Sequence, residues 1–329
     1  MNNLLVICGP TATGKTSLAL GLVKKFKGEL ISADSRQVYT HMDVVTGKDI
    51  PDGFDFRPSD KKIPGMSIGY YTNGKVKIWG HDLVTPDQNF SAKLYKDFSH
   101  VVIRDIIARN KLPIVVGGTG FFIRSVIEKL DRIDIPKDER LRKELNGLSA
   151  DKLFMIFMKT NPKKAQELND SEKRNARRLI RHLEVDKYEK IQNLRISSNE
   201  LVQLEFDNLL KIGLYYRNRD NHEKAIDKRT KVRISEKLEK EISFLKKKDY
   251  LNYAPKDTIG YREWIGYLNG EYSKSAAIKK WKRAECQYAK RQMTWFQKQK
   301  EINWFDVQKK GYINNVEKLV WKWHNGLDQ

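Results

Sequence analysis

The stretch Leu4–Thr16, LLVICGPTATGKT, constrains the fold of this chain more than any other segment. Leu4–Cys8 is an apolar run of the length of a buried strand, and Gly9–Thr16 matches the phosphate-binding pattern G-x-x-x-x-G-K-[ST]. Apolar residues from Leu18 to Phe26 then recur with helical spacing. Strand, glycine loop and helix in this order predict a site for two linked phosphates, which the motif alone does not assign to ATP.

The residues of the glycine loop have distinct expected roles. Backbone N–H groups of the loop and of the following helix bind phosphate oxygens. We expect Lys15 to reach the terminal phosphates and the Thr16 hydroxyl to hold Mg²⁺, the one cofactor that the sequence predicts. The predicted diphosphate-binding residues are Gly9, Pro10, Thr11, Ala12, Thr13, Gly14, Lys15 and Thr16.

Two further strands are predicted to end beside this loop. Glu29–Ser32 is followed by Asp34, and Lys111–Val116 runs into a second glycine loop, Gly117–Gly120. Residues just past the carboxyl ends of parallel strands line the ligand crevice, so we expect Asp34 to face the first loop. There Asp34 could bind Mg²⁺ through water or act as a general base; a turn or N-cap aspartate is the alternative.

The alternation of strands and helices changes near residue 131. We expect residues 1–130 to form the first part of a P-loop NTPase-like α/β core, in which helices flank a parallel sheet. Residues 131–184 are predicted to form an all-helical insertion, and residues 185–329 a return to the core followed by a helical, basic C-terminal region. One predicted helix over 163–190 places four arginines at spacings of three and four on one face: Arg174, Arg177, Arg178 and Arg181.

The charge of the chain favours a polyanionic partner. The net charge is +21, of which residues 1–100 carry +3 and the remainder +18. Such a basic remainder favours nucleic acid, although a solvated Lys-rich surface is the alternative. Near the end, Gln287–Phe296 interleaves Lys, Arg and Gln with Tyr and Trp, which suits phosphate contact and base stacking. The alternative places Trp295 and Phe296 in the core.

The rest of the composition excludes other classes of protein. The two cysteines, Cys8 and Cys286, predict neither a disulfide framework nor a zinc site. No apolar run reaches membrane-spanning length, and the first strand begins almost at once, without a signal peptide. We therefore expect a cytoplasmic protein that does not contact membranes.

Seven motifs, in the same order over nearly the whole chain, resemble the tRNA dimethylallyltransferases, also called tRNA isopentenyltransferases or IPP transferases. They are GPTATGKT at 9–16, ISADSRQVY at 31–39, His81-Asp82 with Pro86-Asp87 and Phe90-Ser91, PIVVGGTGFF at 113–122, RRLIRHLEV at 177–185, IGYRE at 259–263 and AKRQMTWF at 289–296. No zinc-finger segment follows them, so we expect a member of the bacterial type.

The resemblance implies a reaction. A dimethylallyl group moves from dimethylallyl diphosphate to N6 of the adenosine immediately 3′ of the anticodon, in tRNAs that read codons starting with U, and pyrophosphate leaves. The catalytic residues would be Asp34, which accepts or hydrogen-bonds the amine proton, with Lys15 and Thr16, which stabilise the leaving diphosphate. The family fold is a P-loop core with a helical insertion that clasps the anticodon stem-loop, and we expect a monomer.

The resemblance also implies which residues contact tRNA. Gln37 suits recognition of the adenine edge, and Thr119 lies at the mouth of the channel. The complete expected set is Asp34, Ser35, Arg36, Gln37, Thr119, Arg142, Arg177, Arg178, Arg181, Tyr261, Arg262, Lys290, Arg291, Gln292 and Trp295.

One departure from the family pattern bears on catalysis. The family usually has Thr-Arg where this chain has Glu285-Cys286. If that arginine helps to bind the diphosphate, another cation must replace it, and Arg283 and Lys290 are the candidates. The sequence therefore leaves open a tRNA-binding homologue with impaired catalysis. It also leaves open a P-loop kinase of a small molecule or nucleoside, and a prenyltransferase that acts on free adenylate.

Overall fold

The computed structural model describes residues 2–130, 132–192, 204–234 and 236–327. The chain forms two compact units. The larger unit combines Met1–Glu128 with Leu204–Gln329, and the smaller one comprises Lys129–Gln203. The smaller unit is therefore an insertion in the sequence of the larger.

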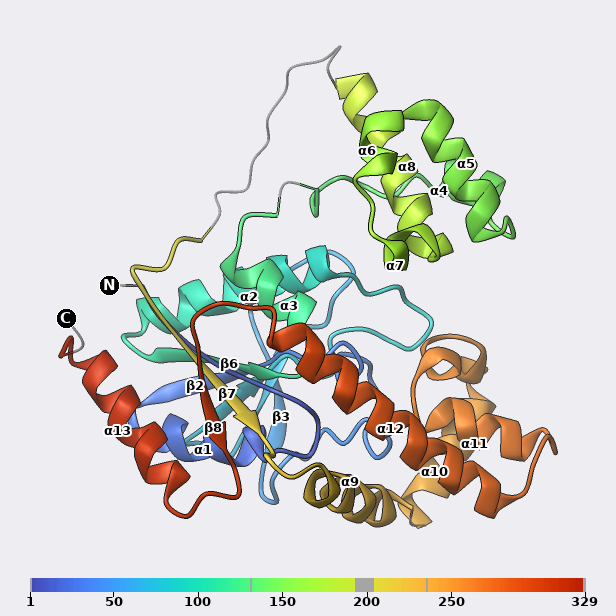
Figure 1. The fold of residues 1–329 in the computed structure, drawn as a ribbon. Helices are drawn as coiled ribbons and strands as arrows, with labels where there is room; N and C mark the ends of the chain where they lie inside the picture. The colour runs from blue at the N-terminus through green and yellow to red at the C-terminus, as the bar shows by residue number, and fades with distance from the viewer. Residues whose placement is uncertain (1, 131, 193–203, 235, 328–329) are drawn as a thin grey trace. The chain divides into compact units, whose positions relative to one another are not determined.

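An eight-stranded sheet forms the centre of the larger unit (Figure 1). Across the sheet the strands follow the order β3 (Asp55–Pro58), β4 (Gly69–Thr72), β5 (Lys77–Trp79), β2 (Gly28–Ser32), β6 (Leu112–Gly117), β1 (Asn3–Cys8), β7 (Asn208–Tyr215) and β8 (Ile302–Asp306). The strands from β5 to β8 pair in parallel. At one edge β3 and β4 run antiparallel, and the Asn73-Gly74 turn joins β4 to β5.

Helices cover both faces of this sheet (Figure 1). On one face, α1 (Lys15–Lys25) and α13 (Tyr312–His324) bury leucine, valine and tryptophan side chains against the strands. On the other face, α2 (Ala92–Ala108), α3 (Gly120–Ile127) and the end of α12 (Lys274–Phe296) form a second apolar cluster. The two clusters confirm the predicted α/β architecture, because a parallel sheet is stable only when both of its faces are covered.

The remaining helices of the larger unit lie between β7 and α12 in sequence. They are α9 (Arg219–Arg233), α10 (Glu236–Lys247) and α11 (Tyr261–Leu268), and the 3₁₀ turns Tyr250–Asn252 and Ala254–Asp257 lie between α10 and α11. Two of these helices, α10 and α11, extend the second cluster. Leu238, Trp264 and Trp281 are buried together in this region. Helix α12 therefore joins the sheet at one end to this helical region at the other.

The smaller unit is all-helical where the structure describes it, but the predicted end of the insertion at residue 184 is wrong, because a helix continues past that residue to Gln192 and the unit extends to Gln203. Its helices are also shorter than the sequence suggested. They are α4 (Glu139–Leu145), α5 (Ala150–Thr160), α6 (Pro162–Gln166), α7 (Asp170–Lys173) and α8 (Ala176–Gln192). The single helix expected over 163–190 is wrong, because asparagine side chains cap successive helices. Asn161 caps α6, Asn169 caps α7, and Asn175 accepts a hydrogen bond from the Arg178 N–H at 3.2 Å. Arg174 therefore ends α7 and does not share a helix with the other arginines.

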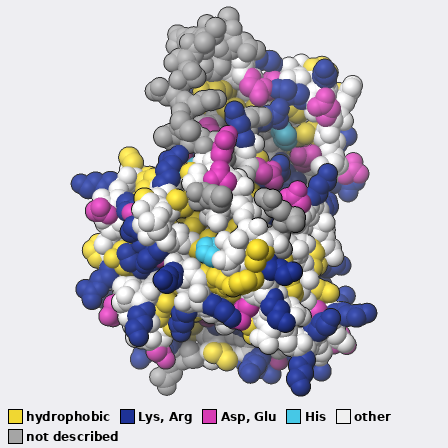
Figure 2. Space-filling view, turned by 90° about the vertical axis from the view of Figure 1, so that its left-hand side faces the viewer, with side chains coloured by type: hydrophobic (Ala, Val, Ile, Leu, Met, Phe, Trp, Pro, Cys, Tyr) yellow, Lys and Arg dark blue, Asp and Glu magenta, His cyan; other side chains and the backbone are white. Residues whose placement is uncertain are grey.

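The basic composition appears directly on the surface. Lys and Arg side chains are spread over the face of the molecule shown in Figure 2. Across the described residues, none of the helices combines the length and the apolar character that a membrane span requires.

Candidate active site

A cavity of about 340 Å³ lies where β1, β2 and β6 end. Its lining includes Thr11, Lys15 and Thr16 from the glycine loop and the start of α1, together with Asp34, which follows β2. The sequence predicted that these residues would meet at the carboxyl ends of parallel strands, and the structure confirms it. We call this space the central cavity.

At Gly9 and Gly14 the first glycine loop has a positive φ, a backbone conformation that favours glycine. Gly9 has a φ of 135°, and a Cβ there would lie 2.3 Å from the Leu214 carbonyl oxygen. Gly14, at the start of α1, has a φ of 78°. The Thr13 hydroxyl and the Lys15 Nζ both donate to the Pro10 carbonyl, at 2.9 and 2.6 Å. The loop is therefore held in shape by its own side chains.

The electrostatic setting of Lys15 suits an anion. Burial, with a smaller contribution from the neighbouring Arg229, lowers the pKa of Lys15 to about 7, against the opposing effect of Asp34. The lining of the central cavity has seven basic side chains, Lys15, Arg36, Lys48, Arg229, Arg233, Arg262 and Arg291, and three acidic ones, Asp34, Asp257 and Glu285. A ligand with several negative charges would relieve the repulsion between Lys15 and Arg229.

The segment that carries Asp34 is held against the second glycine loop. The Arg36 N–H donates to Asp34 Oδ1 at 2.8 Å, and the Ser35 N–H donates to Thr119 Oγ1 at 3.0 Å. Gln37 lies deeper: its Nε2 donates to the Gly47 carbonyl at 2.8 Å. The first of these bonds orients the Asp34 carboxylate, and the other two hold the segment that carries it.

Gln292 connects the two glycine loops. Its Oε1 accepts the Thr11 N–H at 2.9 Å, and its Nε2 donates to the Gly118 carbonyl at 2.9 Å. A Cβ at Gly118 would lie 2.1 Å from that Nε2, so glycine is needed for the approach. The sequence predicted Gln292 as a tRNA contact, but its side chain is buried and positions the loops.

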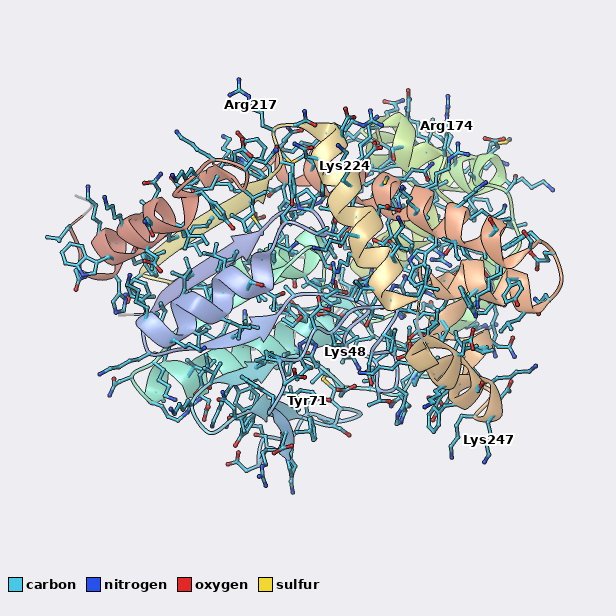
Figure 3. All side chains as sticks on the ribbon, turned by 90° about the horizontal axis from the view of Figure 1, so that it is seen from below. Lys48, Tyr71, Arg174, Arg217, Lys224 and Lys247 are labelled. Atoms are coloured by element: carbon cyan, nitrogen blue, oxygen red, sulfur yellow. The ribbon has the colours of Figure 1, made fainter. Side chains whose placement is uncertain are left out.

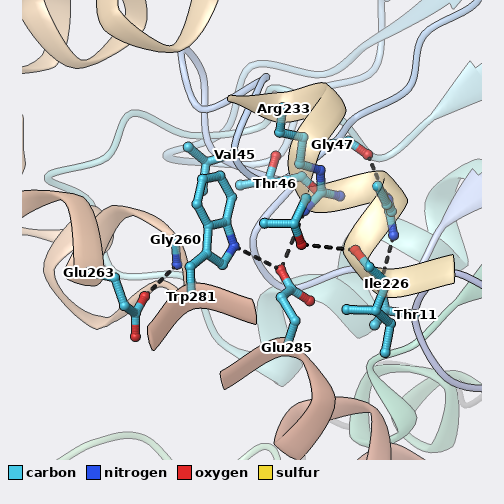
Figure 4. A network of polar contacts seen from close by, with 12 residues as sticks. Thr11, Val45, Thr46, Gly47, Ile226, Arg233, Gly260, Glu263, Trp281 and Glu285 are labelled. Carbon is cyan, nitrogen blue, oxygen red and sulfur yellow. Dashed lines mark hydrogen bonds and ion pairs between the residues drawn. The ribbon is translucent and has the colours of Figure 1, made fainter. Parts of the chain in front are cut away.

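Helix α9 contributes residues that sequence reasoning missed (Figure 4). Arg229 Nη1 donates to Thr11 Oγ1 at 2.6 Å. Its Nη2 donates to Asp49 Oδ2 at 2.9 Å and to the Gly47 carbonyl at 3.3 Å. The ring nitrogen of His222 lies 2.8 Å from the Thr11 carbonyl. Arg229 thus places a guanidinium beside the phosphate-binding loop.

The cations expected to replace the family arginine lie elsewhere. Arg283 and Lys290 line a different cavity, of about 880 Å³, together with Cys286. Neither is among the described residues that line the central cavity, where Arg229 and Arg233 lie instead. The replacement of the family arginine by Arg283 or Lys290 stays a prediction: α12 directs both side chains to this second cavity, which Pro10 of the glycine loop also lines.

The other residues of the larger unit predicted to contact tRNA divide into two groups. Arg36, Arg262 and Arg291 line the central cavity. Tyr261, by contrast, is fully buried and donates its hydroxyl to Glu241, so its side chain is part of the core. Trp295 is half-buried, with its ring packed against Gly120.

Lys48, which is labelled in Figure 3, is a buried lysine at the wall of the central cavity. Lys48 lines it and donates to the Tyr39 carbonyl at 2.7 Å. Its Nζ also pairs with Asp43 and with Asp82, which accepts the Tyr71 hydroxyl at 2.6 Å. Because its charge is paired, Lys48 stabilises the loop between β2 and β3.

The predicted arginines of the smaller unit differ in their surroundings. Arg142 donates two hydrogen bonds to the buried Glu184 carboxylate. Arg181 contacts the same carboxylate at 3.2 Å and the Ile135 carbonyl at 2.7 Å, so both arginines help to hold the unit together. Arg177 and Arg178, at the start of α8, are exposed.

The residues of the central cavity fit a magnesium ion that is bound mainly through a ligand. No group of three or more His, Cys, Asp or Glu side chains that could hold a metal occurs in the part of the chain that the structure describes. The Thr16 hydroxyl and the Asp34 carboxylate both line the cavity. One or two such oxygens, completed by phosphate oxygens and water, are the ligands that Mg²⁺ commonly takes.

Known proteins resemble this chain over almost its full length. Residues 72–299 match the family model described as IPP transferase. A tRNA dimethylallyltransferase of Halothermothrix orenii is 37% identical, covering 97% of this chain and 92% of that protein.

Solved structures agree. The tRNA isopentenylpyrophosphate transferase of Bacillus halodurans superposes with a TM-score of 0.67 at 30% identity, covering 98% of this chain and 96% of that one. A eukaryotic dimethylallyltransferase acting on tRNA gives a TM-score of 0.72 at 22% identity, with 97% of this chain and 77% of that one covered, and shows the same fold. With the family motifs in order, the matched region and the shared fold, this chain belongs to the IPP transferase family.

Proposed function

We propose that this chain transfers a dimethylallyl group from dimethylallyl diphosphate to tRNA. The acceptor is N6 of the adenosine immediately 3′ of the anticodon, in tRNAs that read codons starting with U. The observation that carries the proposal is a single cavity that contains a two-phosphate loop and the carboxylate of Asp34. The names of the relatives, tRNA dimethylallyltransferase among them, support the same reaction.

The geometry suggests what each group does. The loop N–H groups, Lys15 and Arg229 bind the diphosphate of the donor. The amine nitrogen of the adenine attacks C1 of the dimethylallyl group, while the C1–O bond breaks and its electron pair leaves with pyrophosphate. Asp34 accepts the proton that the amine loses. Positive charge at the loop is already in place for the charge that develops on the leaving group, which lowers the barrier.

Mg²⁺ is the proposed cofactor. The Thr16 hydroxyl would hold it, with Asp34 as a second ligand through water. When bound, the ion neutralises charge on the diphosphate and makes it a better leaving group.

Transfer RNA is the proposed macromolecular partner, recognised through its anticodon stem-loop. The basic side chains of the central cavity and the exposed Arg177 and Arg178 suit phosphate contact. We further propose that the chain acts as a monomer in the cytoplasm. The monomer is supported by the larger unit, which supplies both glycine loops and Asp34 from one chain.

The test is incubation with dimethylallyl diphosphate labelled in the prenyl group, Mg²⁺ and unmodified bulk tRNA, followed by nucleoside analysis. Label in N6-dimethylallyladenosine is the expected result, and Asp34→Asn should greatly slow its appearance. Label on free adenylate, or phosphate transfer from ATP to a small molecule without tRNA, would contradict the proposal. Retained tRNA binding without any transfer at saturating donor would identify a binding protein instead.

A further inference from the structure

Two opposite charges are buried together in the wall of the central cavity. Arg233, the last residue of α9, and Glu285, in the middle of α12, are each 8% exposed and both line the cavity. Arg233 Nη1 lies 3.4 Å from Glu285 Oε1, which also accepts the Trp281 Nε1–H at 3.3 Å (Figure 4). Trp281 is fully buried, so the carboxylate has a fixed position.

The pair is incompletely satisfied. The buried Nε–H of Arg233 has no hydrogen-bond partner among the described residues. A buried ion pair adds little stability by itself, and a buried donor without a partner is unfavourable. Such a group at the wall of a cavity is therefore suited to an additional anionic ligand.

Arg233 also lies close to the arginine that contacts the glycine loop. A Cβ at Gly47 would lie 2.1 Å from Arg233 Nη2 and 2.8 Å from Arg229 Nη2, so both guanidinium groups converge on this glycine. Arg229 in turn donates to Thr11 of the loop. Two adjacent guanidinium groups repel each other, and an anion between or beside them removes that repulsion.

We propose that Arg233 is a second guanidinium that binds the diphosphate, and that Glu285 is the positioning residue that holds it at the cavity wall. This inference rests on the proposed function. The family usually carries an arginine at the position of Cys286, and the inference identifies α9 as the source of that positive charge in this chain. It also gives Glu285, which stands where the family usually has threonine, a role in the same site.

The test measures binding of inorganic pyrophosphate in the presence of Mg²⁺, without tRNA, by calorimetry. Four proteins are compared: wild type, Arg233→Met, Glu285→Gln and the double variant. A single variant leaves one buried charge without a partner and can unfold for that reason. The double variant removes both charges, so we expect it to stay folded. Lys224→Met removes an exposed positive charge from the same helix and should leave the Kd unchanged.

The signs of the charges predict an order of affinity. The double variant should bind pyrophosphate roughly 10- to 100-fold more weakly than wild type, because one charge-assisted hydrogen bond is lost. The Arg233→Met variant should bind pyrophosphate more weakly still, because the negative charge of Glu285 is then no longer paired with Arg233 and repels the anion. Glu285→Gln keeps a hydrogen-bond acceptor for Arg233 but removes the competing negative charge, so it should bind at least as tightly as wild type.

The outcomes separate this inference from the proposed function. A folded double variant that binds pyrophosphate within threefold of wild type would show a purely structural pair and overturn the inference, even if prenyl transfer is observed. Weaker binding by Glu285→Gln would show that the charge of Glu285, and not only its acceptor oxygen, holds Arg233 in position, whereas a folded Glu285→Ala variant that binds as tightly as wild type would overturn the role of Glu285. If pyrophosphate binding depends on Arg233 but labelled donor never reaches tRNA, the inference stands and the proposed reaction fails.

Discussion

The Thr11 N–H lies 2.9 Å from Gln292 Oε1, although 281 residues separate the two in sequence. Thr11 belongs to the loop that starts the fold, and Gln292 belongs to the long helix α12 near its end. The same side-chain amide bonds to Gly118 of the second glycine loop. The position of the diphosphate loop therefore depends on a residue that the sequence motif of the loop does not contain.

Gln292→Ala should weaken binding of dimethylallyl diphosphate, because it removes the partners of one N–H and one carbonyl at the loops. We expect KM for the donor to rise roughly 10-fold, the effect of one or two lost hydrogen bonds at a buried site. Steady-state kinetics at saturating tRNA measure this. Gln297→Ala, exposed at the end of the same helix, is the control. An unchanged KM would mean that the loop holds its shape alone.

Asp34→Asn should lower kcat and leave tRNA binding intact. The amide still accepts a hydrogen bond from the Arg36 N–H, so the turn is preserved, but it cannot take a proton. The loss of a general base lowers kcat by about 10²- to 10⁴-fold. Single-turnover transfer and filter binding of tRNA measure the two effects separately. Loss of tRNA binding with residual chemistry would contradict the catalytic assignment.

The centre of the site could be predicted from sequence because it depends on local pattern and one topological rule. Apolar strands that run into Gly9–Thr16, Asp34 and Gly117–Gly120 must end at the same edge of a parallel sheet. Arg229 and Arg233 gave no such signal, since α9 contains basic residues on every side. What distinguishes Arg233 is burial, and burial depends on Glu285, 52 residues later. The available signal was Glu285 itself, a charged residue among the buried positions of α12, which indicates a buried cationic partner.

Substitutions of Arg178 and Arg181, both in the smaller unit, should have different effects: the first on tRNA binding and the second on stability. Arg178→Gln removes an exposed charge, so the slope of log K against log salt for tRNA should decrease by about 1, with unchanged thermal stability. Arg181→Gln loses contacts to Glu184 and to backbone carbonyls, and should lower stability by about 1–3 kcal/mol. Salt titrations and thermal unfolding measure both. An unchanged slope for Arg178→Gln would identify a solvated face.

Tyr261→Phe distinguishes a core tyrosine from a tRNA contact. The hydroxyl donates to Glu241, whose carboxylate also accepts the N–H groups of Asp43 and Val44, both at 2.7 Å. Loss of one such bond should reduce the free energy of unfolding by about 1 kcal/mol, while the Kd for tRNA stays the same. Denaturant unfolding and filter binding provide the comparison. A weaker Kd without a stability change would restore the tRNA-contact assignment.

The lowered pKa of Lys15 predicts that diphosphate binding takes up a proton. Burial and Arg229 lower this pKa to about 7, so at pH 8 the amine of the free protein is mostly neutral. The negative charge of a bound diphosphate favours the ammonium form and raises the pKa. Between pH 7 and that raised value the complex holds more protons than the free protein. The contribution of Lys15 to affinity should therefore decrease as the pH rises through this window.

Calorimetry of pyrophosphate binding at pH 8, in two buffers with different ionisation enthalpies, measures this uptake. Pyrophosphate exchanges protons of its own, so the informative quantity is the difference between wild type and Lys15→Met. Wild type should take up about one more proton per site than this variant. Lys24→Met, at an exposed position of the same helix, should behave like wild type. Equal uptake by wild type and Lys15→Met would mean that Lys15 is already charged before the diphosphate binds, and that the repulsion from Arg229 is screened by Asp34.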